Sequence, residues 1–315
     1  MTAPARPGVL LPRIVLKARP TEEQLSDRLR PPMPEGLEIY LDVADIAPPD
    51  WLPVLEARLG AHQLPDQFAL LVEGPVRSLD GAFFDLSIDS PANRAVVERL
   101  ARFGRAVGAG AACVHMIAPT DDLSGAAHDQ AELILERCRP LARRYVRCCR
   151  DAGLTPTVEN VPPVARMREA RLMTSSVGAP PEHLARLGDA VPGLRFTVDT
   201  SHAQLFLNAA NAGDPEPGLA ALCASMAAAS PVRTMAEFVG VLSGRIETVH
   251  VSDAEGLLGE GLPYGQGAMD LDGALDLLLH EAGAMVAEIL EPDPSRSENM
   301  RAAEARIKAR RQARA

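Results

Sequence analysis

The chain has 315 residues, of which 47% are hydrophobic, 23% are charged and only 3% are aromatic. This is the composition of a globular protein whose interior is built mainly from aliphatic side chains. The formal net charge of -10 opposes binding to a phosphate backbone, so we expect no nucleic-acid partner.

Basic residues gather near the C-terminus, within an Arg-Ala-Glu-rich stretch over residues 301–314. Such a composition is more typical of the solvated face of a helix than of a binding surface. We therefore expect a terminal helix over residues 295–315.

The five cysteines include neither a CxxC pair nor a zinc-finger spacing, which is typical of reduced thiols in a cytoplasmic protein. Residues 1–12 form an extension rich in proline and alanine, without a long apolar run after a basic start. No stretch has the length and apolar character of a membrane span. We expect a cytoplasmic protein that is neither secreted nor bound to a membrane.

Eight short apolar runs follow one another along the chain, each nearly continuous in apolar character, as in parallel strands buried on both faces. The runs cover residues 13–17, 37–41, 68–72, 112–117, 155–158, 194–198, 246–251 and 284–290. Segments with helical periodicity lie between them, including residues 93–107, 129–152, 231–242 and 271–282. Strand and helix thus alternate about eight times, the pattern of a parallel α/β fold.

This alternation fits an open doubly wound sheet or a closed barrel. No GxGxxG turn follows the first run, so a dinucleotide-binding sheet has no support. Closed barrels of about 250 residues commonly form one unit. We predict a single (β/α)8 TIM-barrel domain over residues 1–315.

Polar residues stand at the ends of the last four runs, at Glu159, Asp199, His250 and Glu288. In a barrel, the C-terminal ends of the strands converge on one pocket. A buried carboxylate is costly unless it is paired or bound to a metal. Three carboxylates and one imidazole form a ligand set that suits Mn²⁺, Co²⁺, Mg²⁺ or Zn²⁺. Alternatively, Glu159 and Glu288 pair with arginines and only hold the barrel together.

From about Gly36 onward, the chain resembles the xylose isomerase-like TIM-barrel superfamily of sugar phosphate isomerases and epimerases, which also includes endonuclease IV. The segments that carry this resemblance are Val158-Glu159-Asn160, Asp199-Thr200-Ser201-His202, His250-Val251-Ser252-Asp253, Gly265-Gln266-Gly267 and Glu288. The resemblance implies that Glu159, Asp199, His250 and Glu288 bind one divalent metal ion, and that His202 touches the substrate.

Two departures concern the number of metal ions. Nucleases that resemble endonuclease IV hold three zinc ions with extra histidines, whereas this chain has Glu73-Gly74-Pro75 and Gly259-Glu260-Gly261 at the matching places. A mononuclear site is therefore favoured.

The implied function is a metal-dependent isomerase or epimerase of a sugar, sugar phosphate or related polyol. A metal bound to the carbonyl and neighbouring hydroxyl oxygens would stabilise an enediolate. Glu159 and Glu288 would then remove and return the proton. Alternatives are a lyase or dehydratase on the same scaffold, an endonuclease IV-like phosphodiesterase, and a barrel that only binds a ligand.

Further candidates for substrate binding are His115, Asn160, Asp253 and Lys17. Lys17 ends the first run, where it would bind a carboxylate or phosphate or form a Schiff base, with a surface ion pair as the alternative. His115 lines the pocket or is a core histidine.

The other four histidines are expected at the surface: His62, His128, His183 and His280. Specificity is expected to lie in the loops over residues 78–88, 164–180 and 208–230. The last of these is a candidate lid or contact within a homo-oligomer.

Overall fold

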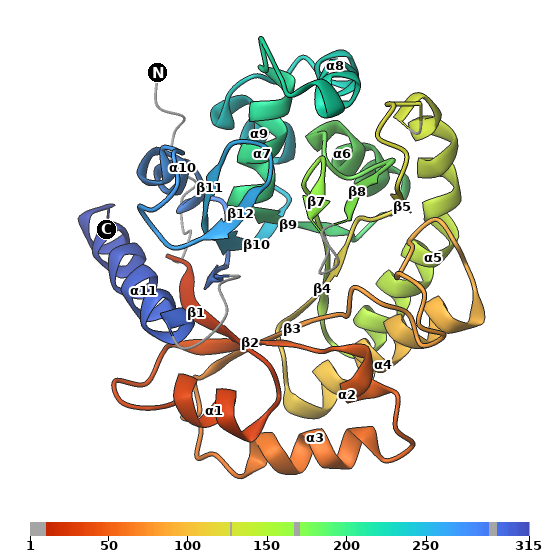
Figure 1. Cartoon of the computed structure of the whole chain (residues 1–315). Helices are drawn as coiled ribbons and strands as arrows, with labels where there is room; N and C mark the ends of the chain where they lie inside the picture. The colour runs from red at the N-terminus through yellow and green to blue at the C-terminus, as the bar shows by residue number, and fades with distance from the viewer. Residues whose placement is uncertain (1–10, 127, 167–170, 290–294, 315) are drawn as a thin grey trace.

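The eight apolar runs form a closed barrel of parallel strands in the computed structural model, which describes residues 11–126, 128–166, 171–289 and 295–314. Figure 1 shows the strands at the centre with helices around them. In order around the barrel, the strands are β1 (Arg13–Ala18), β2 (Gly36–Tyr40), β3 (Ala69–Glu73), β4 (Ala111–His115), β6 (Thr155–Glu159), β9 (Arg195–Asp199), β10 (Ile246–Val251) and β13 (Ala284–Ala287). The predicted (β/α)8 fold is confirmed. Strand β13 ends earlier than expected, and residue 290 lies outside the described residues.

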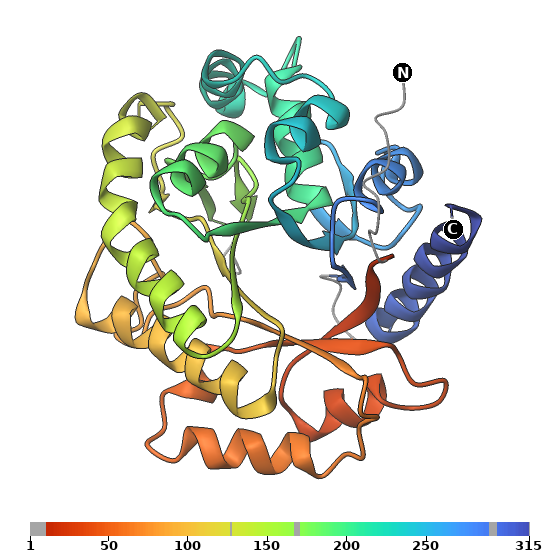
Figure 2. The same ribbon diagram turned by 180° about the vertical axis from the view of Figure 1, so that it is seen from behind.

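The helices lie outside the barrel, and Figure 2 shows the same arrangement from behind. They are α1 (Glu22–Arg28), α2 (Val43–Ile46), α3 (Trp51–Gly60), α4 (Pro91–Val107), α5 (Ala131–Asp151), α6 (Pro181–Ala190), α7 (Thr200–Ala210), α8 (Ala220–Ala229), α9 (Met235–Leu242), α10 (Leu271–Leu278) and α11 (Ser295–Arg314), with short 3₁₀ turns η1 (His128–Gln130) and η2 (Pro217–Leu219). Capping sets several of these boundaries. Helix α9 begins later than its periodicity suggests, because Thr234 and Glu237 form a capping box at its start.

Short strands extend the loops at the carboxyl ends of the barrel strands. β5 (Pro119–Thr120), β7 (Ala165–Arg166) and β8 (Leu172–Ser175) form a small antiparallel sheet, and β11 (Asp253–Glu255) pairs with β12 (Gly259–Leu262). Two of the three expected specificity loops thus contain regular structure. The segment over residues 208–230 contains α8, which packs against α7.

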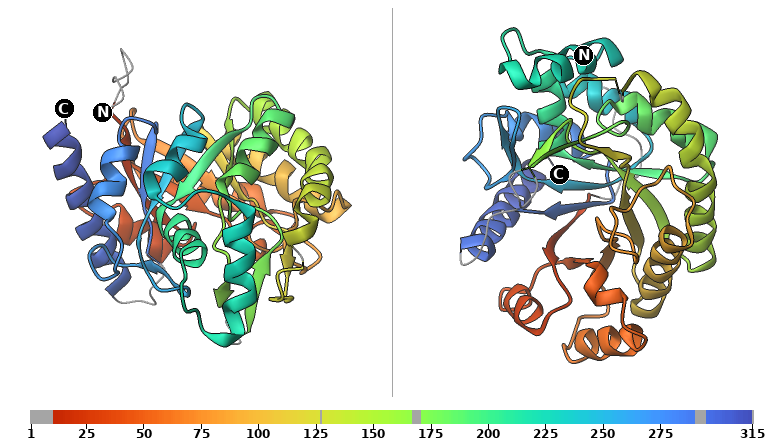
Figure 3. Two further views of the ribbon diagram at one scale, coloured as in Figure 1. Left: turned by 90° about the horizontal axis from the view of Figure 1, so that it is seen from above. Right: turned by 45° about the vertical axis from the view of Figure 1, so that its right-hand side comes forward.

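The arginines of α11 attach this helix to the start of the chain. Arg301 donates hydrogen bonds to the carbonyl oxygens of Pro32 and Arg30 at 3.0 Å each, and Arg311 donates to Glu35 at 2.8 Å. Figure 3 shows α11 at one edge of the molecule, opposite α5. The expected terminal helix is present over Ser295–Arg314; Arg306 and Arg314 are exposed, as expected of a solvated face, whereas Arg301 and Arg311 contact the start of the chain.

Two of the histidines expected at the surface are buried, so that expectation is wrong for His128 and His183. They lie beside β8 and the segment that follows it, where His183 Nδ1 accepts a hydrogen bond from Gly178 N at 3.2 Å. His128 Nε2 lies 3.4 Å from Thr174 Oγ1. None of the helices in the described part of the chain is long and apolar enough to cross a membrane.

Three buried threonines link adjacent strands beneath the ends of β6, β9 and β10. Thr197 Oγ1 donates to Thr157 Oγ1 at 2.8 Å and also shares a hydrogen bond with Thr248 Oγ1. Thr157 Oγ1 in turn donates to Ala112 O at 3.1 Å. Each threonine precedes a predicted metal ligand by two residues, and side chains two residues apart on a strand point the same way. The threonine layer therefore supports the predicted ligands from below.

We predict that Thr197→Val lowers the free energy of unfolding by about 1–3 kcal/mol, because an isosteric apolar side chain leaves buried hydroxyl groups without their partners. Denaturant unfolding monitored by circular dichroism measures the change. Unchanged or increased stability would show that the threonine layer contributes nothing.

We also predict a pH-dependent stability that depends on His183. Burial, with contributions from His128 and Arg186, lowers the pKa of His183 to about 4. The unfolded chain therefore binds more protons between this value and the ordinary pKa of about 6.5, and stability falls as the pH is lowered through this window. Relative to wild type, His183→Asn should remove up to ~3 kcal/mol of this dependence. The exposed His280→Asn is the control, and equal pH profiles for wild type and His183→Asn would contradict the prediction.

Candidate metal centre

The four predicted metal ligands are buried at the carboxyl ends of four strands. Glu159 and Asp199 are the last residues of β6 and β9, His250 lies one residue before the end of β10, and Glu288 follows β13. His250 is the register partner of Asp199 on the adjacent strand. Glu288 N bonds to Val251 O at 3.1 Å. Strand register therefore delivers these four side chains to one level of the barrel.

His250 lies between two of the predicted ligands. Its Nδ1 atom is 3.3 Å from Glu159 Oε2 and 3.0 Å from Glu288 Oε2. Its Nε2 atom is 2.9 Å from Oε2 of Glu38, which was not among the predicted site residues. One imidazole thus has a carboxylate on each side.

Asp199 also caps the next helix and lies beside His202. Its Oδ1 atom accepts hydrogen bonds from His202 N at 2.7 Å and from Ser201 Oγ at 2.8 Å, which places a negative charge at the positive end of α7. His202 Nδ1 lies 3.5 Å from Glu159 Oε1 and 2.9 Å from Asn160 O. The first turn of α7 therefore points His202 at the predicted ligands.

Asn160 joins the ends of β6 and β9. Its Nδ2 donates to Asp199 O at 3.1 Å, and its Oδ1 accepts from Asp199 N at 2.8 Å. These bonds occupy both ends of the amide and fix the spacing between Glu159 and Asp199.

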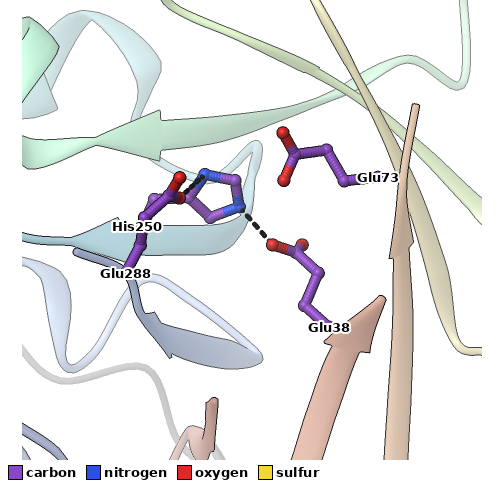
Figure 4. Close-up of side chains that lie close together, drawn as sticks. All are labelled: Glu38, Glu73, His250 and Glu288. Atoms are coloured by element: carbon purple, nitrogen blue, oxygen red, sulfur yellow. Dashed lines mark ion pairs between the residues drawn. The ribbon is translucent and has the colours of Figure 1, made fainter. Parts of the chain in front are cut away.

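A second group of carboxylates lies on the other side of His250. Figure 4 shows Glu38 from β2 and Glu73 from β3 pointing toward His250 and Glu288. Glu38 carries the signal used for the other ligands, a carboxylate inside an apolar strand. It was missed because it stands in the middle of its run, between Leu37 and Ile39.

Lys17 is buried among these carboxylates. Its Nζ atom is 2.6 Å from Glu288 Oε1, forms a close ion pair with Glu73 and lies 3.9 Å from Glu38 Oε2. The alternative of a surface ion pair is therefore wrong. Burial alone would lower the pKa of Lys17, but Glu288 and Glu73 outweigh burial and hold this pKa well above its ordinary value. The amine stays protonated, which disfavours a Schiff base.

His115 and Glu260 complete the polar surroundings. His115 Nε2 lies 3.6 Å from Glu73 Oε1 and 3.7 Å from Glu159 Oε2, and burial lowers its pKa, so its imidazole is neutral at neutral pH. Glu260, on β12, lies 3.6 Å from His202 Nε2. Both Glu73 and Glu260, noted in the sequence only as departures from a histidine pattern, thus face the site.

Asp253 is buried beside the glycine-rich loop. Its Oδ1 accepts from Ala254 N at 2.8 Å and its Oδ2 accepts from Gly265 N at 2.9 Å. A Cβ atom at Gly267 would lie only 2.3 Å from Asp253 Oδ1, so the loop needs glycine there to pack against this carboxylate. These contacts describe a residue that shapes the loop.

The pKa values indicate an excess of negative charge. Burial raises the pKa of Glu73 well above its ordinary value and also raises the pKa of Asp199. Burial would lower the pKa of His250, but Glu38 and Glu159 outweigh burial and raise that pKa well above its ordinary value. Neighbouring carboxylates add to the effect of burial on Glu73 and Asp199. An added cation would relieve the same imbalance.

Three overlapping groups of the described residues could hold a cation, each with ligand atoms within 4.8 Å of one another. They are Glu38, Glu73, His250 and Glu288; Glu73, His115 and Glu159; and Glu159, Asp199 and His202. No group contains all four predicted ligands, which are divided between the first and third groups and joined by the contact between Glu159 and His250.

The donor set fits a divalent metal ion. The Nδ1 atom of His250 and Oε2 of Glu288 are buried and have no hydrogen-bond partner, although both lie close to Glu159 or to each other. Carboxylate oxygens with imidazole nitrogen suit Mn²⁺, Co²⁺, Mg²⁺ and Zn²⁺. Among the ion pairs of the described residues, no arginine contacts Glu159 or Glu288, which argues against arginine pairing of these two carboxylates.

No family model matches the sequence, and a search of curated proteins finds no match. Solved structures are similar over nearly the whole chain. A D-tagatose 3-epimerase-like protein has a TM-score of 0.65 at 16% identity, covering 96% of this chain and 99% of its own. The D-allulose 3-epimerase from Methylomonas sp. has a TM-score of 0.64 at 14% identity, covering 98% and 100%. This chain shares their fold.

A further similar structure is the TTHB071 protein from Thermus thermophilus, described as soaked with ZnCl2. Its TM-score is 0.62 at 19% identity, with 95% of this chain and 97% of that chain covered. The expected resemblance to the xylose isomerase-like barrels is thus confirmed for the fold, and what the site does rests on its own residues.

Proposed function

We propose that this protein is a divalent-metal-dependent isomerase or epimerase of a sugar, sugar phosphate or related polyol. The observation that carries the proposal is the position of His250 Nδ1, which faces Glu159 at 3.3 Å and Glu288 at 3.0 Å in a buried site. Glu159, Asp199, His250 and Glu288 would hold one ion. When bound, the ion would polarise a substrate carbonyl group and so acidify the neighbouring C–H bond.

Glu159 and Glu288 are suited to move the proton. Strands β9 and β10 separate them in the barrel order, so the two carboxylates would approach a bound substrate from different strands. Although burial opposes it, His250 together with His115 lowers the pKa of Glu159, and Lys17 together with His250 lowers the pKa of Glu288. Both groups are therefore carboxylates, the form that accepts a proton, at neutral pH.

The histidines beside these carboxylates are suited to bind hydroxyl groups. The neutral imidazole of His115 can donate or accept a hydrogen bond. For His202, burial lowers the pKa, but Asp199 and Glu260 outweigh burial and raise it, which favours a donor of two hydrogen bonds. A polyhydroxylated substrate matches such a set, and the D-tagatose 3-epimerase-like and D-allulose 3-epimerase structures carry names of that class.

A lyase or dehydratase would use the same ion and base, and would differ by expelling a hydroxyl group. A phosphodiesterase is a second candidate, because the overlapping cation groups share Glu73 and Glu159 and so resemble a site for several ions. Cleavage of duplex DNA that carries abasic sites, abolished by Glu159→Gln, would support the phosphodiesterase and overturn the isomerase.

We predict that Asp199→Ala and His250→Ala each lower the bound metal sharply, because each removes one of the proposed ligands. Elemental analysis of purified variants measures the metal per chain, with the exposed Glu98→Ala as control. Normal occupancy in both ligand variants would place the ion elsewhere.

We predict that Glu288→Gln lowers the rate of proton exchange by about two to four orders of magnitude, since it removes a proton acceptor but keeps one oxygen ligand. A screen of ketoses, cyclitols and their phosphates in deuterated water identifies a processed substrate, and mass spectrometry then measures deuterium uptake. Glu98→Gln is the matched control. Undiminished exchange in a Glu288→Gln protein that melts much earlier would show that Glu288 is structural.

A further inference from the structure

The ammonium group of Lys17 lies where the group of Glu38, Glu73, His250 and Glu288 would hold an ion. Nζ contacts Glu73 and Glu288 directly and lies 3.9 Å from Glu38, so it touches or approaches three of the four candidate ligands. Nζ also lies 5.7 Å from the centroid of the Tyr40 ring. A lysine ammonium has three donors and a compact charge, which suit three surrounding carboxylates.

Strand order explains why the side chain reaches this place. β1 lies between β2 and β13 in the barrel, so Lys17 has Glu38 on one neighbouring strand and Glu288 just beyond the other. Lys17 is the direct register partner of Glu38. The positions two residues before Lys17, Glu73 and Glu288 are Val15, Leu71 and Val286, which form an apolar layer beneath them. The ammonium therefore rests on an apolar floor that excludes water.

We propose that Lys17 is a built-in cation that fills this deep group and prevents a second divalent ion from binding there. The inference rests on the metal site proposed above. The group is a ligand set for a cation, because Oε2 of Glu38, Glu73 and Glu288 is buried in each case and has an ion-pair contact, with Lys17 or His250, but no hydrogen-bond partner. A positive charge fixed within this group repels a divalent ion from the same place.

Lys17 also positions Glu288. Oε1 of Glu288 faces the ammonium at 2.6 Å, whereas Oε2 faces His250 Nδ1 at 3.0 Å. One oxygen of Glu288 thus contacts the ammonium of Lys17, and the other faces the proposed metal site. Lys17 is a positioning residue, because it acts through Glu288 and Glu73.

The experiment counts Mn²⁺ per chain by equilibrium dialysis in wild type and in Lys17→Met, which keeps the length of the side chain and removes its charge. We expect Lys17→Met to bind about one Mn²⁺ more than wild type. The double variant Lys17→Met/Glu38→Gln should lose this extra ion, because it lacks one ligand of the deep group. Lys308→Met is the matched control, since Lys308 is the other lysine of the chain and pairs with Glu304 on α11.

Thermal melting provides a second readout. Without Mn²⁺, Lys17→Met should melt earlier than wild type, because three buried carboxylates lose their counter-ion. Excess Mn²⁺ should recover more of this loss in Lys17→Met than in the double variant.

A third measurement uses the wild-type protein, in case the variants do not fold. With only two lysines, ¹³C-lysine labelling gives separate signals for Lys17 and Lys308. Mn²⁺ should broaden the Lys17 signal, because Glu288 and His250 bring the proposed ion close to it, and should leave Lys308 sharp.

The outcomes separate this inference from the proposed function. No added ion in Lys17→Met, or a Lys17 signal unaffected by bound Mn²⁺, overturns the role of Lys17. Wild type that binds no Mn²⁺ overturns the proposed metal enzyme, whereas a gain of one ion in Lys17→Met would still support Lys17 as the occupant of the deep group.

Discussion

Burial of carboxylates at the carboxyl ends of the strands is the constraint on which this molecule depends. Glu38, Glu73, Glu159, Asp199 and Glu288 are all buried around one imidazole, His250. An isolated buried carboxylate would be strongly destabilising, so each must be paired, protonated or bound to a cation. The chain meets this need partly with Lys17 and with the histidines. Burial still raises the pKa values of Glu73 and Asp199, which is consistent with a place for a further cation.

The scaffold holds these groups in fixed positions. The threonine layer joins β6, β9 and β10 beneath the proposed ligands, and Asn160 ties the ends of β6 and β9 together. Asp199 is fixed further by the first turn of α7. A site supported by hydrogen bonds on strands is pre-organised, so little reordering accompanies the binding of an ion or substrate.

The chemistry of the site is set as much by the cations as by the carboxylates. Among the described residues, Lys17 pairs with carboxylates on the side of the barrel formed by β1, β2 and β3, whereas the carboxylates that end β6 and β9 form ion pairs with histidines alone. This asymmetry is consistent with the proposed single ion on the latter side. Glu73 pairs with Lys17, whereas a site for three ions would have a histidine at this position.

The sequence by itself determined the strand order and the level of the site, because hydrophobic runs and the two-residue alternation of strands are local properties. Polar residues at run ends predicted that Glu159, Asp199, His250 and Glu288 are neighbours, and the family resemblance added His202. Glu38 was missed because it stands within a run, and the burial of His128 and His183 depends on a loop that no local pattern describes.

Only the tertiary structure decided which charges meet. Lys17 lies far from Glu288 along the chain, yet closure of the barrel places β1 beside β13 and brings their side chains together. Asp253 is a predicted substrate-binding residue, and the fold places its carboxylate against the backbone amides of Ala254 and Gly265. Residue types are read from the sequence, whereas the partner of a buried charge depends on strand closure and register, which bring together residues distant in the chain.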